Sequence, residues 1–417
     1  MPSGLAGRIE TGTTLRIRIE VPSKCHEGRA ASPSCGVSHH FRDARRFNGV
    51  PVVFRSHPRL GIVALASFAA LAFTIRSQPA SAAAPRCSSE ERAELLAPST
   101  PERPLVSLSC SIQLDRNDVV TRQIIVEGKS ADGMRVDCNG ALIDGEANTV
   151  NKNRYTVFIR SLGETEPEMT NNRPAGIEFH NCRIRGSIRI QGLRMTRGAN
   201  GSWQSSRSLG HTARAQAAAP TRIVFDGLDI VTNHNSAIYV AFGVTHVQIR
   251  NSKISGAIGY PAIYLDAESG SNIIENNLIA ARVANREQIA IDGSASNIIR
   301  NNVFSNIRAG GIFLYRNCGE RGIVRHQKPE HNIIQGNEFF DGVERKNVPL
   351  IWVGSRNGKR SFCAEDAGLP FGSSVDDGDF ADENRIEKNI VVTRGSPEFI
   401  RDAGRRNLVV GNMVRMR

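Results

Sequence analysis

The sequence predicts an all-β fold, a single-stranded parallel β-helix (a solenoid) of about ten coils, on the basis of three observations. A short apolar run followed by Asn recurs from about residue 176, its period is close to 25 residues, and each repeat consists of β-branched runs of three to five residues separated by Gly, Asn and Ser. A fixed period of this size indicates a repeat architecture. No repeat has room for a helix beside its strands, so we expect each one to form a single coil of a β-helix.

The residue that ends each apolar run is nearly always Asn. These positions are Asn181, Asp226, Asn251, Asn277, Asn302, Asn337, Asn389 and Asn412. Successive spacings from Asp226 onward are 25, 26, 25, 35, 52 and 23 residues, so the two long ones mark inserted segments. Asn tolerates left-handed backbone at a tight corner, and stacked Asn side chains bond to one another along a fibre or solenoid axis. We therefore interpret these residues as structural.

An apolar segment near the amino terminus predicts export. Residues 60–75 (LGIVALASFAALAFTI) carry no charge, follow two arginines and precede a run of small residues. This pattern is typical of a secretory signal peptide, here 56–84, cleaved after Ala82 or Ala84. The alternative is a membrane anchor, but 16 residues are short for a span. We expect a periplasmic or secreted protein with no stable membrane span after cleavage.

Residues 1–55 show no sustained period of 2 or 3.6, and we expect them to be an extension without a fold of its own. No Met occurs between Met1 and Met134, so we expect translation to start near Val50–Val53. An unusually long basic leader is the alternative.

The charge distribution argues against a nucleic-acid partner. The chain has 53 Lys and Arg against 41 Asp and Glu, a net charge of +12. Residues 1–84 hold eleven of these basic residues and only four acids, which leaves the rest of the chain with a charge of +5. Because more than half of the excess lies in the predicted leader and extension, we rank nucleic-acid binding last.

The remaining chain divides into a cap and a long domain. Residues 88–98 (SSEERAELLAP) predict a short helix within an amino-terminal cap at 85–115, which would cover the open end of the β-helix domain at 116–417. The early coils are expected at 122–128, 134–145 and 155–161, and polar insertions at 163–174 and 196–219.

Six cysteines follow the predicted leader, and an even number in an exported chain permits disulfides. They are Cys87, Cys110, Cys138, Cys182, Cys318 and Cys363. On sequence proximity alone we expect Cys87 to pair with Cys110 and Cys318 with Cys363. Buried free thiols are the alternative.

The segment DCNGALIDG (137–145), the NIIxNN runs and the signal peptide together resemble the right-handed parallel β-helix proteins of the pectate-lyase-like superfamily, over roughly residues 115–415. The resemblance implies a right-handed coil. It implies no single activity, because the superfamily includes polysaccharide lyases, glycoside hydrolases, uronan epimerases and copper-site maturation proteins. The Gly-His-Gly and Asp-Pro-His-Asp motifs of the hydrolases and alginate epimerases do not occur in this sequence.

The candidate functional residues lie on one strand of each coil. These strands lie in AIYVA (237–241), AIYLDAE (262–268), QIAIDGS (288–294), GIFLYRN (311–317) and LIWVGSR (350–356). Strand alternation places four residue pairs in the core: Ile263 and Leu265, Ile289 and Ile291, Ile312 and Leu314, and Ile351 and Val353. The first outward column is then Tyr239, Tyr264, Ala290, Phe313 and Trp352. The second outward column, two residues further along each strand, is Ala241, Asp266, Asp292, Tyr315 and Gly354.

The aromatic residues of the first column suit sugar binding, so Tyr239, Tyr264, Phe313 and Trp352 are the predicted substrate-binding residues. Beside them, Asp266 and Asp292 would stand about 5 Å apart on adjacent coils, and two stacked carboxylates favour a cation between them. Calcium held by Asp266, Asp292 and Glu268 is the one cofactor we expect.

The predicted catalytic residues are Asp266, Asp292, Tyr315 and Arg316. Arg316 could bind the carboxylate of an acidic sugar. Tyr315 or Arg316 could take up a proton, a role that the resemblance to pectate lyases implies for an Arg. Alternatively, inserted loops cover the aromatic rings and the Asp residues only cap turns or pair with Arg. The acidic run at 376–383 (DDGDFADE) favours a solvated loop over a calcium loop.

The expected partner is a polysaccharide, most simply an anionic one, and the preferred activity is that of a lyase or an epimerase at uronic acids. A non-catalytic surface or envelope protein that binds a glycan or another partner is the alternative. The sequence sets no oligomeric state.

Overall fold

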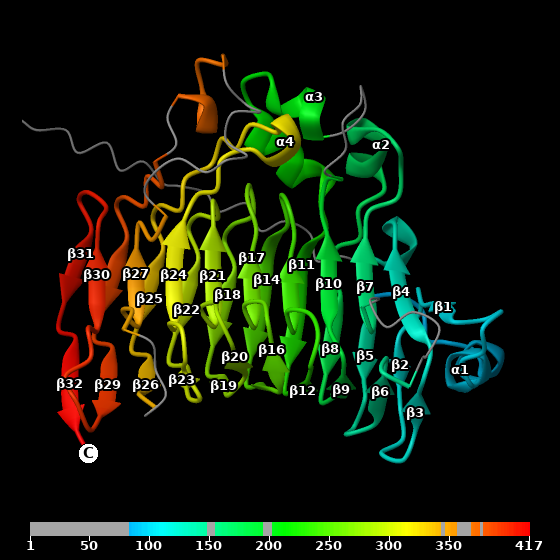
Figure 1. The fold of residues 1–417 in the computed structure, drawn as a ribbon. Coiled ribbons are helices and arrows are strands. Elements are labelled where there is room, and N and C mark those ends of the chain that lie inside the picture. The colour runs from blue at the N-terminus through cyan, green and yellow to red at the C-terminus, as the bar shows by residue number, and fades with distance from the viewer. Residues whose placement is uncertain (1–82, 148–154, 195–201, 343–346, 357–367, 376–377) are drawn as a thin grey trace, which may run out of the picture. The chain divides into compact units, whose positions relative to one another are not determined.

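A computed structural model of the chain describes residues 83–147, 155–194, 202–342, 347–356, 368–375 and 378–417 (Figure 1). The chain divides into two units, Met1–Ile75 and Arg76–Arg417, and the fold described below belongs to the second. The predicted extension and all of the predicted signal peptide up to residue 82 lie outside the described residues. Within the described part of the chain, no helix is long and apolar enough to cross a membrane.

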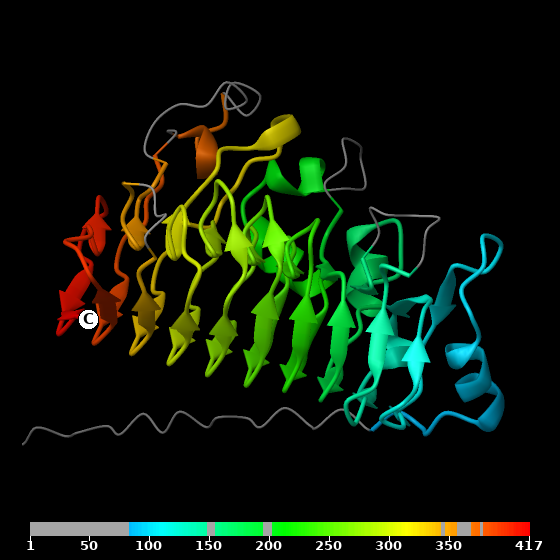
Figure 2. The same ribbon diagram turned by 60° about the horizontal axis from the view of Figure 1, so that its bottom comes forward.

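The described residues form three parallel sheets of ten strands each, and every coil contributes one strand to each sheet (Figures 1 and 2). Sheet 1 consists of β1 Leu105–Ser107, β4 Gln123–Glu127, β7 Val157–Arg160, β10 Ile188–Gln191, β13 Ile238–Val240, β17 Ile263–Leu265, β21 Ile289–Asp292, β24 Ile312–Tyr315, β27 Ile351–Val353 and β30 Ile400–Asp402. Sheet 2 consists of β2 Ile112–Gln113, β5 Arg135–Asp137, β8 Glu178–His180, β11 Thr221–Asp226, β14 Thr245–Arg250, β18 Ile273–Glu275, β22 Ile298–Arg300, β25 Ile333–Gln335, β28 Arg385–Glu387 and β31 Leu408–Val410. Sheet 3 consists of β3 Val119–Val120, β6 Leu142–Asp144, β9 Arg183–Arg185, β12 Asp229–Val231, β15 Lys253–Ser255, β19 Leu278–Ile279, β23 Val303–Phe304, β26 Glu338–Phe340, β29 Ile390–Thr393 and β32 Met413–Met416. The predicted fold class, a parallel β-helix of about ten coils, is confirmed.

Short elements fill the turns between coils. The short pair β16 Ala257–Ile258 and β20 Arg282–Val283 forms a further small sheet. The helices are α1 Ser89–Leu96, α2 Glu166–Asn171, α3 Ser202–Ser206 and α4 His211–Ala218, and 3-10 turns occur at Lys129–Ala131, Glu320–Gly322 and Gly372–Ser374. Figure 1 shows α2, α3 and α4 above the carboxyl ends of the sheet 1 strands, in the two insertions expected from the sequence.

Helix α1 lies where the sequence predicts a short helix. Ser88 and Glu91 form a capping box at its start, with a bond from the Ser88 N–H to the Glu91 carboxylate at 2.7 Å. Leu95 is fully buried against the first coils. The first coil already begins at Leu105, within the segment 85–115 that the sequence analysis assigns to the cap.

The core consists of apolar side chains stacked in columns, coil upon coil. All eight inward residues expected from strand alternation, from Ile263 to Val353, have no exposed surface. Aromatic rings stack in the same way: the centroids of Phe304 and Phe339 are 4.5 Å apart. Because side chains alternate strictly along a strand, this inward set leaves the residues between them on the outer face.

Two ladders of Asn side chains hold the coils in register. In one ladder, each Asn Oδ1 accepts bonds of 2.9–3.0 Å from the backbone N–H and side-chain amide of the equivalent Asn in the preceding coil, through Asn277, Asn302, Asn337, Asn389 and Asn412. The second ladder, with bonds of 2.7–3.2 Å, consists of Asn272, Asn297, Asn332, Asn384 and Asn407. The sequence analysis predicted the first ladder and missed the second, although its Asn opens each NIIxNN run.

The alignment of three residues with the first ladder is wrong, by one residue for Asn181 and Asn251 and by two for Asp226. Arg250 pairs with Glu275, so Asn251 aligns with Asn276 rather than Asn277. Asn181, Asn251 and Asn276 all adopt left-handed backbone, with φ between 52° and 57°. The corner role and the ladder role, which the sequence analysis assigned to one residue, therefore belong to adjacent residues.

The predicted disulfide between Cys87 and Cys110 is confirmed. A second disulfide joins Cys138 to Cys182, which sequence proximity did not suggest because 44 residues separate them. Strand register explains this second disulfide. Asp137 pairs with His180, and the two cysteines follow these residues in adjacent coils, so they lie side by side. Cys318 is also disulfide-bonded. Its expected partner, Cys363, lies outside the described residues.

We expect Asn302→Ala to lower the free energy of unfolding by roughly 2–4 kcal/mol, because it leaves buried amide groups of its ladder neighbours without partners. Chemical denaturation measures the loss. Asn412→Ala is the matched control, since Asn412 lies partly exposed at the last rung and water can replace its bonds. Equal losses for the two variants would contradict a stabilising role of the buried ladder.

Candidate functional site

The outer face of sheet 1 carries the first outward column in the predicted order. Strand register aligns Tyr239, Tyr264, Ala290, Phe313 and Trp352. The Tyr239 and Tyr264 rings stack with their centroids 4.9 Å apart, and Phe313 meets Trp352 edge to face at 5.5 Å. The column also extends in both directions beyond the predicted range, to Arg189 and Phe158 on one side and Arg401 on the other.

Arginines lie over several of these rings. The Arg189 guanidinium is 4.3 Å from the ring centroid of Tyr239, and that of Arg401 is 4.5 Å from Trp352. Both arginines are partly exposed. We call Phe158, Arg189, Tyr239, Tyr264, Phe313, Trp352 and Arg401 the arginine–aromatic stripe. The sequence analysis missed its arginines, although IRIQ (188–191) and FIRD (399–402) place Arg in the outward phase.

The stripe is interrupted at Ala290, where Tyr315 takes part in the apolar packing. Ala290, Phe313 and Tyr315 form a small cluster outside the main core, and Tyr315 has no exposed surface. Its hydroxyl donates to Glu287 at 2.9 Å and accepts from Arg286 at 2.7 Å. Burial raises the pKa of Tyr315 well above its usual value, and the charge of Glu287 raises it further. Tyr315 is therefore out of reach of a bound sugar, which argues against its predicted role as a base.

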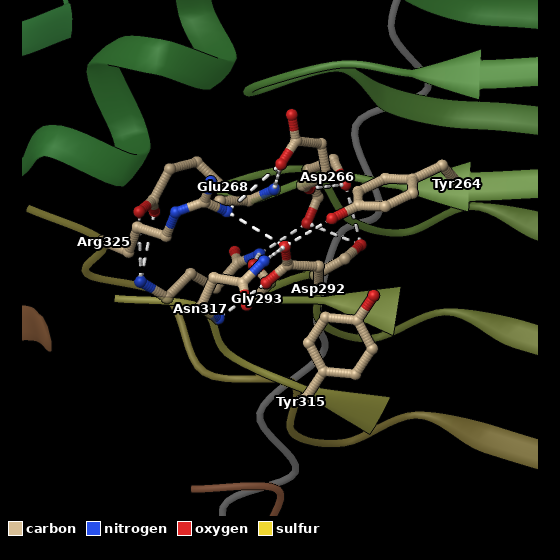
Figure 3. Close-up of polar contacts among 12 residues, drawn as sticks. Tyr264, Asp266, Glu268, Asp292, Gly293, Tyr315, Asn317 and Arg325 are labelled. Atoms are coloured by element: carbon tan, nitrogen blue, oxygen red, sulfur yellow. Dashed lines mark hydrogen bonds and ion pairs between the residues drawn. The ribbon is translucent and has the colours of Figure 1, made fainter. Parts of the chain in front are cut away.

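Asp266 and Asp292 stand beside the stripe and accept bonds from its tyrosines (Figure 3). The Tyr239 hydroxyl donates to Asp266 at 2.7 Å, and the Tyr264 hydroxyl donates to Asp292 at 2.6 Å. Burial, and then the charge of the neighbouring carboxylate, raises the pKa of both tyrosines well above the ordinary value. The two Asp residues themselves are buried, with 3% and 0% of their surface exposed.

A cation already lies between the two carboxylates, and it is Arg325. Its Nη1 is 3.2 Å from Asp266 Oδ1 and 3.3 Å from Asp292 Oδ2 (Figure 3). Burial lowers the pKa of Arg325, but the charges of Asp292 and Asp266 outweigh it, so the pKa lies above the usual value. Arg325 belongs to the inserted segment after β24, which folds back over these coils. The arrangement matches the alternative in which the stacked Asp residues pair with an Arg.

Arg316 does not take the position expected for it. Its side chain is buried, and its guanidinium lies 4.6 Å from the ring centroid of Phe380. Weak bonds of 3.4 Å run from it to the backbone carbonyls of Arg325 and Gly378. In this position Arg316 cannot meet the carboxylate of a sugar on the outer face. Arg325 and the stripe arginines are candidate site residues that sequence reasoning missed.

The carboxylate of Glu268, the third predicted calcium ligand, is hydrogen-bonded by other groups of the chain. Its carboxylate accepts a bond from the Thr212 hydroxyl and from the backbone N–H of His326 at 2.7 Å and of Gln327 at 3.2 Å. Burial raises its pKa, against the effect of these bonds. Over the described ranges, the three-residue group whose ligand atoms converge is Cys87, Glu91 and Cys110, and its two sulfurs form a disulfide. Calcium at Asp266, Asp292 and Glu268 stays a prediction, with Arg325 as its competitor.

The acidic run at 376–383 is not simply solvated. Asp379 is buried, and its Oδ2 accepts the backbone N–H of Arg356. Burial raises its pKa to about 7, and the nearby charge of Asp292 acts in the same direction. Asp379 is thus a further titratable group near the stripe. The interpretation of this residue as part of a solvated loop is wrong.

Comparisons with known proteins concern the fold. A family model described as a right-handed β-helix region matches residues 170–358. Together with the three ten-stranded parallel sheets, this match shows a right-handed parallel β-helix fold. No curated protein matches its sequence.

Solved structures with similar folds are distant. An alginate lyase from Paenibacillus sp. is 14% identical, with 71% of this chain and 91% of that chain covered and a TM-score of 0.28. A surface protein and adhesin of Streptococcus pneumoniae is 10% identical, with coverage of 73% and 89% and a TM-score of 0.32. An exopolygalacturonase from Thermotoga maritima is 12% identical, with coverage of 76% of each chain and a TM-score of 0.28. These values carry no information about the activity of this chain.

We expect Arg325→Met to destabilise the protein by about 3–5 kcal/mol, because it leaves two buried carboxylates without their cation. Thermal unfolding measures the loss, and the double variant Arg325→Met with Asp292→Asn should recover part of it. Millimolar calcium should raise the melting temperature of the single variant more than that of the wild type. An unchanged melting temperature for Arg325→Met would contradict the ion pair.

Proposed function

We propose that the chain binds an anionic polysaccharide along the outer face of sheet 1. The observation that carries this proposal is the arginine–aromatic stripe. Aromatic side chains offer apolar area to the C–H groups of sugar rings, and guanidinium groups bind carboxylates in a planar, two-pronged geometry. Both kinds of group lie here in one column on one face, from β7 to β30.

The charge of the stripe fits an acidic ligand. Arg189 bonds to the neutral Gln191 Oε1 at 2.7 Å and to the Tyr155 hydroxyl at 2.9 Å, so its partners do not cancel its charge. The buried carboxylates of Asp266 and Asp292 next to the stripe share one guanidinium, that of Arg325, and Arg401 at the end of the stripe pairs with Glu398. The charge that the stripe offers to an acidic ligand is therefore that of Arg189.

The repeat of the fold also fits a polymer. Equivalent positions on neighbouring coils lie about 4.8 Å apart, so a chain running along the axis meets side chains of the stripe on both sides of a gap at Ala290 and the buried Phe313. Disulfides at Cys87–Cys110 and Cys138–Cys182 fit an oxidising compartment, which supports a periplasmic or secreted location.

Catalysis at a uronic acid is the second candidate function, and the two Tyr–Asp pairs favour it. Burial and the charge of Asp292 raise the pKa of Tyr264, so its hydroxyl is protonated at neutral pH. In a lyase reaction this hydroxyl could pass its proton to the sugar oxygen that leaves and recover a proton from the carbon beside the carboxylate, while Asp292 holds the hydroxyl in place. Binding without catalysis ranks first, because both residues predicted as bases, Tyr315 and Arg316, are buried.

We expect Arg189→Gln and Trp352→Ala each to weaken binding of polymannuronate or polygalacturonate by at least about 10-fold, since each removes a charged or aromatic contact. Isothermal titration at low and at high salt measures this, and affinity should fall as salt rises. Arg300→Gln is the control, because Arg300 is exposed on sheet 2, outside the stripe, and pairs with Glu275. Equal binding by all variants would place the ligand elsewhere.

If the protein is a lyase, incubation with uronans should release unsaturated products that absorb in the ultraviolet, and Tyr264→Phe should lower that rate by about 100-fold or more. Tyr260→Phe is the control, since Tyr260 is exposed away from the stripe. An epimerase would instead incorporate deuterium from heavy water at the carbon beside the carboxylate. Uronan binding without either reaction would identify a non-catalytic binding protein.

A further inference from the structure

The charge on the outer face of sheet 1 changes sign along the solenoid axis. In the coil of β13, the face is positive, because the Arg189 guanidinium lies 4.3 Å from the ring centroid of Tyr239. The hydrogen-bond partners of this guanidinium, Gln191 and Tyr155, are neutral groups. Its positive charge is therefore available to a ligand.

The next two coils, those of β17 and β21, carry negative charge. Their carboxylates, Asp266 and Asp292, share the single guanidinium of Arg325 at 3.2 and 3.3 Å, which leaves one net negative charge (Figure 3). All three side chains are buried, so water and salt screen this charge only weakly. The hydroxyls of Tyr239 and Tyr264 donate to the two carboxylates, so the charge lies against the partly exposed rings of the stripe.

Arg356 brings positive charge back in the coil of β24. Its guanidinium lies 3.9 Å from the ring centroid of Tyr315 and donates to the neutral Asn317 Oδ1 at 2.5 Å. Arg356 is partly exposed, and in the described part of the chain its guanidinium forms no ion pair. Burial raises the pKa of the nearby Asp379 to about 7, so that carboxyl cancels only part of the charge at neutral pH.

Three further arginines on or beside this face are paired with carboxylates and add no net charge. These pairs are Arg160 with Glu127, Arg286 with Glu287, and Arg401 with Glu398. The charge along the axis is therefore positive at β13, negative at β17 and β21, and positive again at β24.

Strand register gives the spacing of the two positive positions. Tyr239 in β13 and Tyr315 in β24 lie three coils apart. Neighbouring strands are about 4.8 Å apart, so the guanidinium groups over these two rings are separated by about 14 Å along the axis. In a polymer made only of uronic acids, every sugar carries a carboxylate. The carboxylates between the two arginines would then face the negative centre and be repelled.

We propose that the ligand of this face is an acidic heteropolysaccharide in which neutral sugars separate the acidic ones, with carboxylates on Arg189 and Arg356 and a neutral sugar over Tyr264. The inference rests on the proposed function, since it names the kind of anionic polysaccharide that lies on the stripe. The Tyr264 ring offers apolar area to a neutral sugar without adding charge. Arg356, which lies outside the stripe, becomes a second carboxylate-binding residue.

Oligosaccharides of equal length from deacylated gellan and from polygalacturonate, titrated calorimetrically at low salt, test the proposal. Neutral sugars separate the glucuronates of gellan, whereas every sugar of polygalacturonate is acidic. The wild type should bind the gellan oligosaccharide at least about 10-fold more tightly, and Arg356→Gln should weaken that binding by a similar factor. Arg300→Gln, on sheet 2, is the control that should change the affinity for neither ligand. Melting temperatures check that both variants fold.

Asp292→Asn provides an arm that alters the charge of the centre and keeps its shape. It removes the net negative charge, so it should strengthen polygalacturonate binding several-fold and narrow the difference between the two ligands. Asp266→Asn makes the same change in charge if Asp292→Asn does not fold.

The outcomes separate this inference from the proposed function. Polygalacturonate binding that equals or exceeds gellan binding in the wild type, or an unchanged gellan affinity in Arg356→Gln, overturns the heteropolysaccharide. If Arg189→Gln still weakens polygalacturonate binding in that case, the proposed function stands alone. A wild type that binds neither oligosaccharide contradicts both.

Discussion

Register between coils is the constraint on which everything else in this protein depends. The two Asn ladders fix it from inside, because each Asn binds the backbone N–H of the Asn one coil earlier, at the same point of the coil. A slip of one residue would leave these buried amides without partners and would turn every strand inside out. Once the register is set, residues 18 or more positions apart in sequence form straight columns, and a column on the outer face becomes a continuous surface.

The inserted segments then decide what each part of that surface can do. Two stacked carboxylates would suit a divalent cation in an open groove. Here the guanidinium of Arg325 takes that place, and Arg325 contacts Asp266 although it lies 59 residues later in the chain. Burying two carboxylates and a guanidinium together is tolerable only because each has several partners, including Tyr239, Tyr264 and Asn317. The three buried groups together carry one net negative charge, and the partly exposed positive charge of the stripe lies on Arg189, because Arg401 pairs with Glu398.

Much of the fold was predictable from the sequence because its determinants are local. The period-2 pattern identifies Ile263 and Leu265 as inward and Tyr264 as outward without any knowledge of the neighbours, and the repeat length identifies the coils. The partners of the outward residues were not predictable in the same way. The contact of Arg325 with Asp266 and Asp292 depends on the path of a loop, for which the sequence has no periodic signal. The burial of Tyr315 depends on its packing against Ala290 and Phe313. Sequence reasoning therefore placed the candidate site residues on the outer face of sheet 1, but it could not tell which of them remain accessible to a ligand.

The second outward column shows how one architecture can carry different chemistry along its length. It holds carboxylates in the coils of β17 and β21, a buried ring in that of β24, and only Gly354 and Ala403 in those of β27 and β30. Where the column is filled, the polar groups are occupied by one another. Where it holds only Gly354 and Ala403, a cavity of about 200 Å³ lies beside it. The character of the outer face therefore changes from coil to coil, because the residue that each coil places in this column decides whether that part of the face is charged, aromatic or open.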